Sequence, residues 1–194
     1  MDRRVLGLER HVMWQAWTGP GLESLRMHGN ADGISAESVS IGLAGGRAYT
    51  VRYALRCDGG WRVRTLEAWT LEGAGLALWS DGRGRWTGPD GAHRPALDGC
   101  FDVDLPSTVF TNTLPVRRLG MLPGWSEEVS VVYVAVPELT LSVARQRYTC
   151  LTWGPDGGRY RFESVGGDFT AEITLDADGL VMEYPRIARR VWSR

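Results

Sequence analysis

The stretch AYTVRYALR at residues 48–56, followed by CDGG at 57–60 and WRVRTLEAWTL at 61–71, says most about the fold. In the first run apolar side chains recur at every second position, as in Val51, Tyr53 and Leu55. This period places them on one face of a half-buried β-strand. The second run repeats the alternation after a turn rich in Asp and Gly. Two such runs at this spacing predict an antiparallel hairpin.

The same reasoning predicts further strands, separated by clusters of Gly, Pro and Asp that form turns. Helix is minor, because only residues 116–122 suggest a short helical turn. Strands at hairpin spacing need a closed or strongly curved sheet to hide their edges. We therefore predict an all-β, single-domain protein over residues 1–194, a curved antiparallel sheet in a barrel, half-barrel or roll with little helix. The further strands are predicted at residues 75–79, 129–136, 139–153, 159–165, 169–175 and 180–184.

Composition restricts the function classes. A net charge of -1 argues against the broad basic surface of a general nucleic-acid binder. No segment approaches the roughly 20 apolar residues needed to cross a bilayer. The first residues lack the apolar run of a secretory signal, so we predict a cytoplasmic protein with no transmembrane segment. The sequence carries no signal for oligomeric state.

The chain has three cysteines, Cys57, Cys100 and Cys150, which are far apart and form no CxxC pair. An odd number of scattered cysteines, in a chain without a secretory signal, is typical of reduced structural thiols. We expect no disulfide between them.

The chain has nine tryptophans. Trp61 and Trp69 share one face of a predicted strand, and Trp79 and Trp86 flank the next turn. Packing in the core is the simpler interpretation, because Trp carries a large apolar area. The alternative is an aromatic platform for a sugar ring or an acyl chain.

The central block LDGCFDVDLPSTVFTNTLPVRRL, residues 97–119, concentrates charge. If Asp102 and Asp104 lie in a strand, both carboxylates project from one face, roughly 6 to 7 Å apart. Such a pair is able to act as acid and base. Arg117 and Arg118 follow beyond a turn, however, and an Arg fork matches a carboxylate. A buried structural network that joins Asp102 to Arg117 is therefore the first interpretation.

Other polar residues are candidates to join this network or a ligand. Asn112 lies in the segment 111–115, which we interpret as a turn that satisfies its own backbone groups, with the residue before Pro115 extended. Arg147 and Tyr148 fall on opposite faces of a predicted strand, and a buried Arg there needs an acidic partner.

Signals for chemistry at a metal or a nucleophile are missing. His11, His28 and His93 are scattered, and no acidic run has the spacing of a calcium loop. No GxSxG motif is present. We therefore predict no catalytic residue, no metal site and no cofactor.

Several of these stretches together resemble the putative glycolipid-binding protein family, a former domain of unknown function, in order along nearly the whole chain. The resemblance implies a spiral β-roll with a half-barrel similar to periplasmic lipoprotein carriers, and a cavity for an amphiphile. It rests on GWRVRTLEAW (60–69), DGRGRW (81–86), LDGCFDVDL (97–105), FTNTLPVRRL (110–119), QRYT (146–149) and DGLVMEYPRI (178–187).

Our hypothesis is that the protein binds a glycolipid or another amphiphile in the roll and does not transform it. One alternative is a hydrolase of carbohydrates or esters that uses Asp102 and Asp104 with Arg stabilisation. Another is a structural or regulatory module with a packed interior. The candidate ligand-binding residues are Trp61, Arg64, Trp69, Asp98, Asp102, Asp104, Asn112, Arg117, Arg118, Arg147 and Tyr148.

Overall fold

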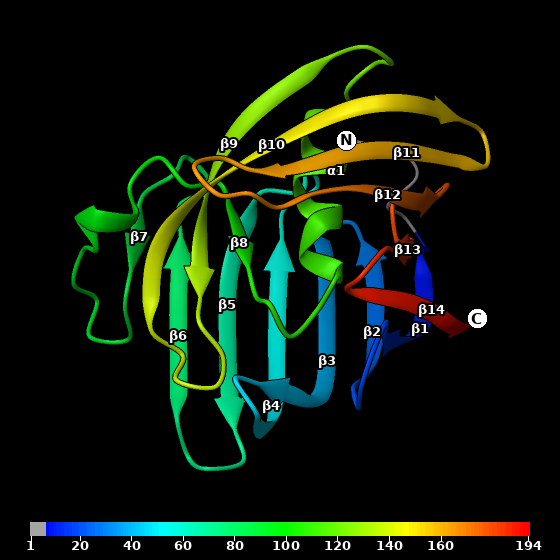
Figure 1. The fold of residues 1–194 in the computed structure, drawn as a ribbon. Helices are drawn as coiled ribbons and strands as arrows, with labels where there is room; N and C mark the ends of the chain where they lie inside the picture. The colour runs from blue at the N-terminus through cyan, green and yellow to red at the C-terminus, as the bar shows by residue number, and fades with distance from the viewer. Residues whose placement is uncertain (1–6) are drawn as a thin grey trace.

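The computed structural model describes residues 7–194, and their strands form one continuous 14-stranded sheet (Figure 1). The N-terminal half supplies β1 (Glu9–Ala16), β2 (Leu22–Asn30), β3 (Gly33–Ala44), β4 (Arg47–Cys57), β5 (Val63–Thr70), β6 (Gly75–Ser80) and β7 (Trp86–Thr87). The C-terminal half supplies β8 (Asp102–Asp104), β9 (Ser126–Val134), β10 (Leu141–Gly154), β11 (Gly157–Ser164), β12 (Thr170–Asp176), β13 (Val181–Tyr184) and β14 (Ala188–Ser193). Three short helices, η1 (Pro95–Leu97), η2 (Phe110–Asn112) and α1 (Thr113–Leu119), lie between β7 and β9.

The strand order is β7-β6-β5-β4-β3-β2-β1-β14-β13-β12-β11-β10-β9-β8. Pairing of β1 with β14 joins the two halves of the chain into one sheet. Every pairing between named strands is antiparallel except that of β8 with β9, which is parallel. The predicted all-β fold with a curved sheet and little helix is confirmed. The sheet does not close into a barrel.

The segment between β7 and β8 brings the two ends of the strand order close together. Gly99 donates its backbone N–H to Gly84 O at 2.9 Å, and the Trp86 indole donates to Cys100 O at 2.8 Å. Edge strands expose unpaired backbone groups, and these contacts cover part of that edge. Figure 1 shows the result, with β3–β6 below, β9–β12 arching above and α1 between them.

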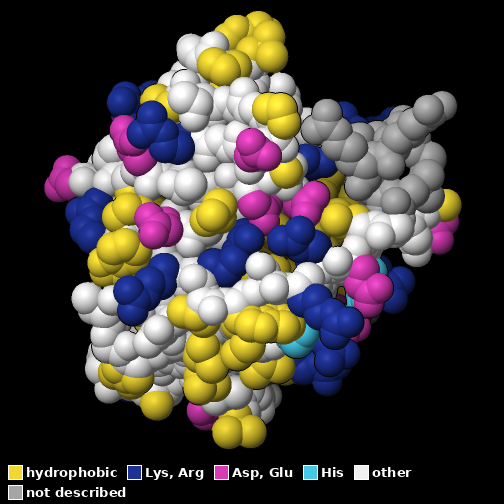
Figure 2. Space-filling model, turned by 90° about the vertical axis from the view of Figure 1, so that its right-hand side faces the viewer, with side chains coloured by type: hydrophobic (Ala, Val, Ile, Leu, Met, Phe, Trp, Pro, Cys, Tyr) yellow, Lys and Arg dark blue, Asp and Glu magenta, His cyan; other side chains and the backbone are white. Residues whose placement is uncertain are grey.

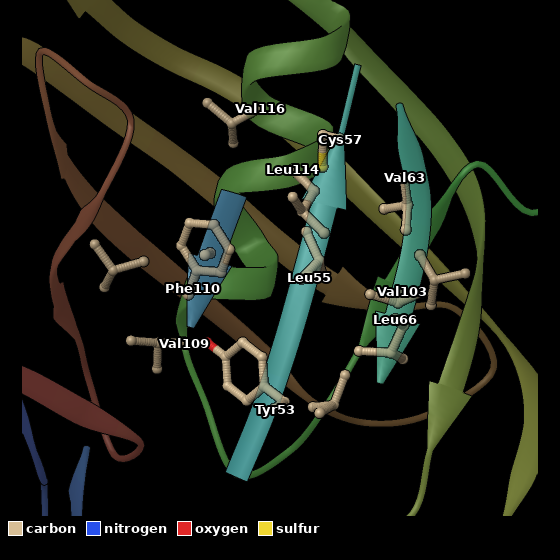
Figure 3. Close-up of a cluster of buried hydrophobic side chains, with 14 of the residues drawn as sticks. Tyr53, Leu55, Cys57, Val63, Leu66, Val103, Val109, Phe110, Leu114 and Val116 are labelled. Carbon is tan, nitrogen blue, oxygen red and sulfur yellow. The ribbon is translucent and has the colours of Figure 1, made fainter. Parts of the chain in front are cut away.

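The centre of the roll is packed solid. Phe110 and Leu114, from η2 and α1, lie fully buried against Tyr53 and Leu55 of β4 and Leu66 of β5 (Figure 3). The helical segment therefore fills the space that the curved sheet encloses at this level. Any hollow in the roll must lie away from this packed centre.

The sequence analysis did not predict β1, β2, β3, β7 or β14 as strands, and two of these, β2 and β3, have an unusual distribution of polar side chains. In β2 and β3, Glu23, Ser38 and Ser40 are buried, whereas Leu22 and Ile41 are exposed. A strand with polar residues inside and apolar residues outside lacks the alternation by which we recognised the others. Ser38 donates a hydrogen bond to Glu23 inside the roll, whereas Ser40 Oγ has no hydrogen-bond partner among the described residues.

Trp61 and Trp69 do not share a face, which corrects the prediction. Trp61 precedes β5 with a φ of 63° and is 2% exposed, whereas Trp69 is 41% exposed. A bulge shifts the β4–β5 register, so that Cys57 opposes Val63 but Arg56 opposes Thr65. An extra residue in one strand reverses which face the following side chains occupy.

The helix begins earlier than predicted, at Thr113 instead of residue 116. Leu114, predicted to be extended before Pro115, is helical and buried. Pro115 occupies the first turn, where the missing N–H has no helical partner in any case. Gly120 then ends the helix with a left-handed φ of 55°, and its N–H donates to Val116 O at 3.2 Å.

The cysteines and the helices bear on two further predictions. Cys57, Cys100 and Cys150 are buried free thiols, as predicted. Within residues 7–194, no helix is both long and apolar enough to span a membrane.

Leu114 and Leu122 offer a matched test of the packed centre, since Leu114 is fully buried and Leu122 is 60% exposed. Leu114→Ala is expected to lower the free energy of unfolding by about 2 to 5 kcal/mol, because it leaves a cavity. Leu122→Ala is expected to change it by less than about 0.5 kcal/mol. Urea unfolding measures both, and equal losses would contradict the packed centre.

Candidate functional site

Asp102 in β8 forms a buried ion pair with Arg118 in α1. The Arg118 Nε lies 3.1 Å from both carboxylate oxygens of Asp102, and its Nη2 lies 2.5 Å from Oδ2. Asp102 has no exposed surface, and Arg118 also stacks over the Phe101 ring at 5.4 Å. Burial raises the pKa of Asp102, although the hydrogen bonds from Arg118 oppose the shift. Both oxygens of the Asp102 carboxylate therefore bond Arg118.

The predicted partner of Asp102, Arg117, lies elsewhere. Its guanidinium stacks over the Trp61 ring at 5.2 Å, and its Nη1 donates to Ala177 O at 3.5 Å. Adjacent helical residues point about 100° apart, so only one of the two arginines reaches Asp102. The predicted pairing of Asp102 with Arg117 is wrong, and the structure instead has a buried pair of Asp102 with Arg118.

Asp104, two positions after Asp102, has neutral hydrogen-bond donors as its partners in the described part of the chain. Gln146 Nε2 donates to its Oδ2 at 2.6 Å, and Thr111 Oγ1 donates to its Oδ1 at 3.2 Å. Within residues 7–194, no arginine or histidine lies within 4.0 Å of it. Burial raises its pKa above the ordinary value for Asp.

A cluster of amide and hydroxyl groups continues from Asp104. The Tyr148 hydroxyl lies 3.1 Å from both Asn112 Oδ1 and Gln146 Oε1. Tyr148 and Gln146 are adjacent on the inner face of β10, two residues apart. The structure brings three of the predicted candidates, Asp104, Asn112 and Tyr148, together with Gln146.

This polar cluster opens into a hollow of about 350 Å³. Besides Asp104, Asn112 and Gln146, the lining includes an aromatic cluster of Phe162, Phe169 and Tyr184, whose ring centroids are 5.9 to 6.0 Å apart. The remaining lining residues come from the segment after β8, from β9 to β11 and from the β13–β14 turn. They are Pro106, Thr108, Val109, Tyr133, Ala144, Ser164 and Ile187.

A second, smaller hollow of about 70 Å³ adjoins the first, because Pro106, Thr108, Val109 and Ile187 line both. Its polar wall contains Glu23, a buried carboxyl that accepts hydrogen bonds from Ser38 Oγ at 2.8 Å and Tyr53 OH at 3.0 Å. Burial raises the pKa of Glu23 to about 7.

The sequence analysis missed Glu23, and also Gln146, Phe162, Phe169 and Tyr184. Glu23, Leu25 and Met27 stand at alternate positions of β2 and are all buried. This alternation was the signal in the sequence that Glu23 faces the interior. The aromatic residues sit in predicted strands or beside them. Only the sheet order places β11, β12 and β13 next to one another.

The remaining candidates do not line the hollow. Trp61 is buried in the core, and Trp69 lies on the outer surface beneath Arg52, whose guanidinium is 5.8 Å from the ring. Arg64 donates to Ser80 O, Asp98 pairs with His93, and Arg147 pairs with Glu128 and Glu163 on the surface. No set of three His, Cys, Asp or Glu side chains arranged for a metal ion occurs within residues 7–194.

Together, the fold and this hollow define an all-β roll with an open sheet, a packed centre and an aromatic-lined cavity that carries a carboxyl group. The sequence matches the family described as "Putative glycolipid-binding" over residues 11–190, and the chain belongs to that family. Its fold is similar to the 1.80 Å crystal structure of a DUF1089 family protein from Pseudomonas aeruginosa. The TM-score is 0.77 at 34% identity, over 90% of this chain and 95% of the other. No curated protein matches this sequence.

The buried pair predicts a large loss of stability on mutation. Asp102→Asn removes one charge and leaves Arg118 without its partner, which is expected to lower the free energy of unfolding by about 3 to 5 kcal/mol. Asp98→Asn is the matched control, since Asp98 is exposed and its pair with His93 is expected to contribute about 0 to 1 kcal/mol. Thermal and urea unfolding compare them. An Asp102→Asn protein as stable as the wild type would refute the structural role of the pair.

Glu23 predicts a pH dependence of stability. Between pH 4.5 and about 7 the folded protein keeps a proton on Glu23 that the unfolded chain has released. The contribution of this group to the free energy of unfolding therefore falls as the pH rises through that window, by about 1 kcal/mol per pH unit. Glu23→Gln removes this dependence, so its stability relative to the wild type should improve from pH 5 to pH 7.

Glu37→Gln, at an exposed position of β3, is the control for this experiment. Its stability relative to the wild type should not follow the same curve. Parallel pH profiles for wild type and Glu23→Gln would show that burial does not hold the proton on Glu23.

Proposed function

We propose that this protein binds a glycolipid or another amphiphile in the hollow between the segment after β8 and strands β9–β13. The observation that carries the proposal is the composition of the wall. One side offers the carboxyl and amide groups of Asp104, Asn112 and Gln146, and another offers the rings of Phe162 and Phe169. Such a wall suits a molecule with a polar head and an apolar part.

The size of the hollow supports the same proposal. Small-molecule sites are typically clefts of about 300 to 1,000 Å³ with mainly apolar walls and a few placed polar groups. A hollow of about 350 Å³ is large enough for a head group and the first part of an acyl chain. The description of the family supports the class of ligand.

The two alternatives have less support. A hydrolase that uses Asp102 and Asp104 needs both carboxyl groups at the substrate, but Arg118 occupies Asp102 in a fully buried pair. A module with a wholly packed interior fits the centre of the roll but not the hollow beside it. Binding without chemistry therefore remains the function that the geometry supports best.

Ala144 and Val143 allow a matched test of the hollow. Ala144 lines it, whereas Val143, the preceding residue of β10, is 43% exposed. Ala144→Phe is expected to fill the hollow and weaken the binding of an alkyl amphiphile by about tenfold or more, because a phenyl ring occupies much of the volume. Val143→Phe should bind like the wild type.

Isothermal titration calorimetry, with each amphiphile below its critical micelle concentration, measures these affinities. Native mass spectrometry of protein purified from its own host would identify a co-purifying ligand by mass. Equal weakening by both substitutions, or saturable binding that neither changes, would place the ligand outside this hollow.

A further inference from the structure

Resting on the proposed function, we propose that the head group bound in this hollow is cationic. The geometry points to an amine or quaternary ammonium group held between the Asp104 carboxylate and the aromatic cluster of Phe162, Phe169 and Tyr184. The proposal narrows the ligand from amphiphiles in general to those with a positive charge at the polar end.

The first argument is the missing countercharge at Asp104. Its two hydrogen-bond donors, Thr111 and Gln146, are both neutral. Asp102, in the same short strand, is neutralised by Arg118 through three contacts. The protein therefore compensates one carboxylate of β8 internally and leaves the other facing the hollow. A carboxylate withdrawn from water without a cation is costly, and a cationic ligand would supply that cation.

The second argument is the charge around the hollow. Burial raises the pKa of Tyr133 and Tyr184, which line the same space, and the nearby charge of Asp104 adds to both shifts. Arg186, whose guanidinium lies over the Phe169 ring, is exposed and donates to Thr170 O. An anionic head group would meet the Asp104 carboxylate here, whereas a cation would meet its opposite charge.

The third argument is the aromatic cluster. The faces of aromatic rings attract cations within about 6 Å, and rings grouped around a carboxylate are a recurrent way to bind ammonium groups. The chain already uses one of these rings in this way, since the Arg186 guanidinium lies 4.8 Å from the centre of Phe169. A neutral sugar would also stack on such rings and accept hydrogen bonds, but it would leave the charge of Asp104 uncompensated.

Three probes with the same alkyl chain separate these head groups: decyltrimethylammonium, decyl glucoside and decyl sulfate, each below its critical micelle concentration. Isothermal titration calorimetry on the wild-type protein is expected to give the ammonium probe an affinity about tenfold or more above that of the glucoside, with the sulfate weakest. Asp104→Asn keeps the size of the side chain but removes its charge and replaces one of its two acceptor oxygens with a donor. It should abolish the preference for the ammonium probe and leave the affinity for the glucoside within about threefold of the wild type.

Asp168→Asn is the matched control, because Asp168 is exposed and adjacent in sequence to Phe169. It should keep the ammonium preference, which would show that a local contact, and not the net charge, sets the order. The order of probes on the wild type decides the question even where Asp104→Asn does not fold. A glucoside bound as tightly as the ammonium probe, or a preference unchanged in a folded Asp104→Asn protein, would overturn the cationic head group and leave the proposed function standing. Binding of none of the probes would overturn both.

Discussion

The ion pair between Asp102 and Arg118 fixes the arrangement on which the rest of the interior depends. It joins the edge strand β8 to helix α1, which are linked in sequence only through a turn and η2. With that contact in place, Phe110 and Leu114 fill the centre of the roll (Figure 3). The pair is able to do this because the planar guanidinium bonds both carboxylate oxygens at once.

Strand β8 carries two aspartates in different environments. The difference distinguishes the buried ion pair at Asp102 from the proposed binding hollow at Asp104. Asp102 turns to the helix and is neutralised, whereas Asp104 turns to the hollow and is held only by neutral donors. A fold that needed both groups for stability would be expected to pair both. Groups kept ready for a ligand are often less favourable for the empty protein, and Asp104 has this character.

The outer surface of the roll carries exposed apolar side chains as well as charged ones. Figure 2 shows apolar side chains gathered in the lower part of one face, among arginines and acidic residues. Exposed apolar residues of β2 and β3 include Leu22, Val39, Ile41 and Leu43. They are exposed because the opposite face of the same strands is committed to Glu23, Ser38 and Ser40 inside. The polar interior near Glu23 therefore determines where apolar surface remains outside.

The sequence by itself determined the class of fold, the free thiols and the importance of residues 97–119. Alternation in segments such as 48–56 is a local property, and it survives wherever apolar residues face the core. It failed for β2 and β3, where hydrogen bonds bury polar residues, and after the β5 bulge, which reversed the faces of the tryptophans. Only the tertiary structure decided that Asp102 meets Arg118, and that Phe162, Phe169 and Tyr184 line one hollow with Asp104. Arg118 reaches Asp102 from a helix on the other side of a turn, and Asp104 lies far along the chain from the three rings, so no local pattern of residues encodes which of these side chains come together.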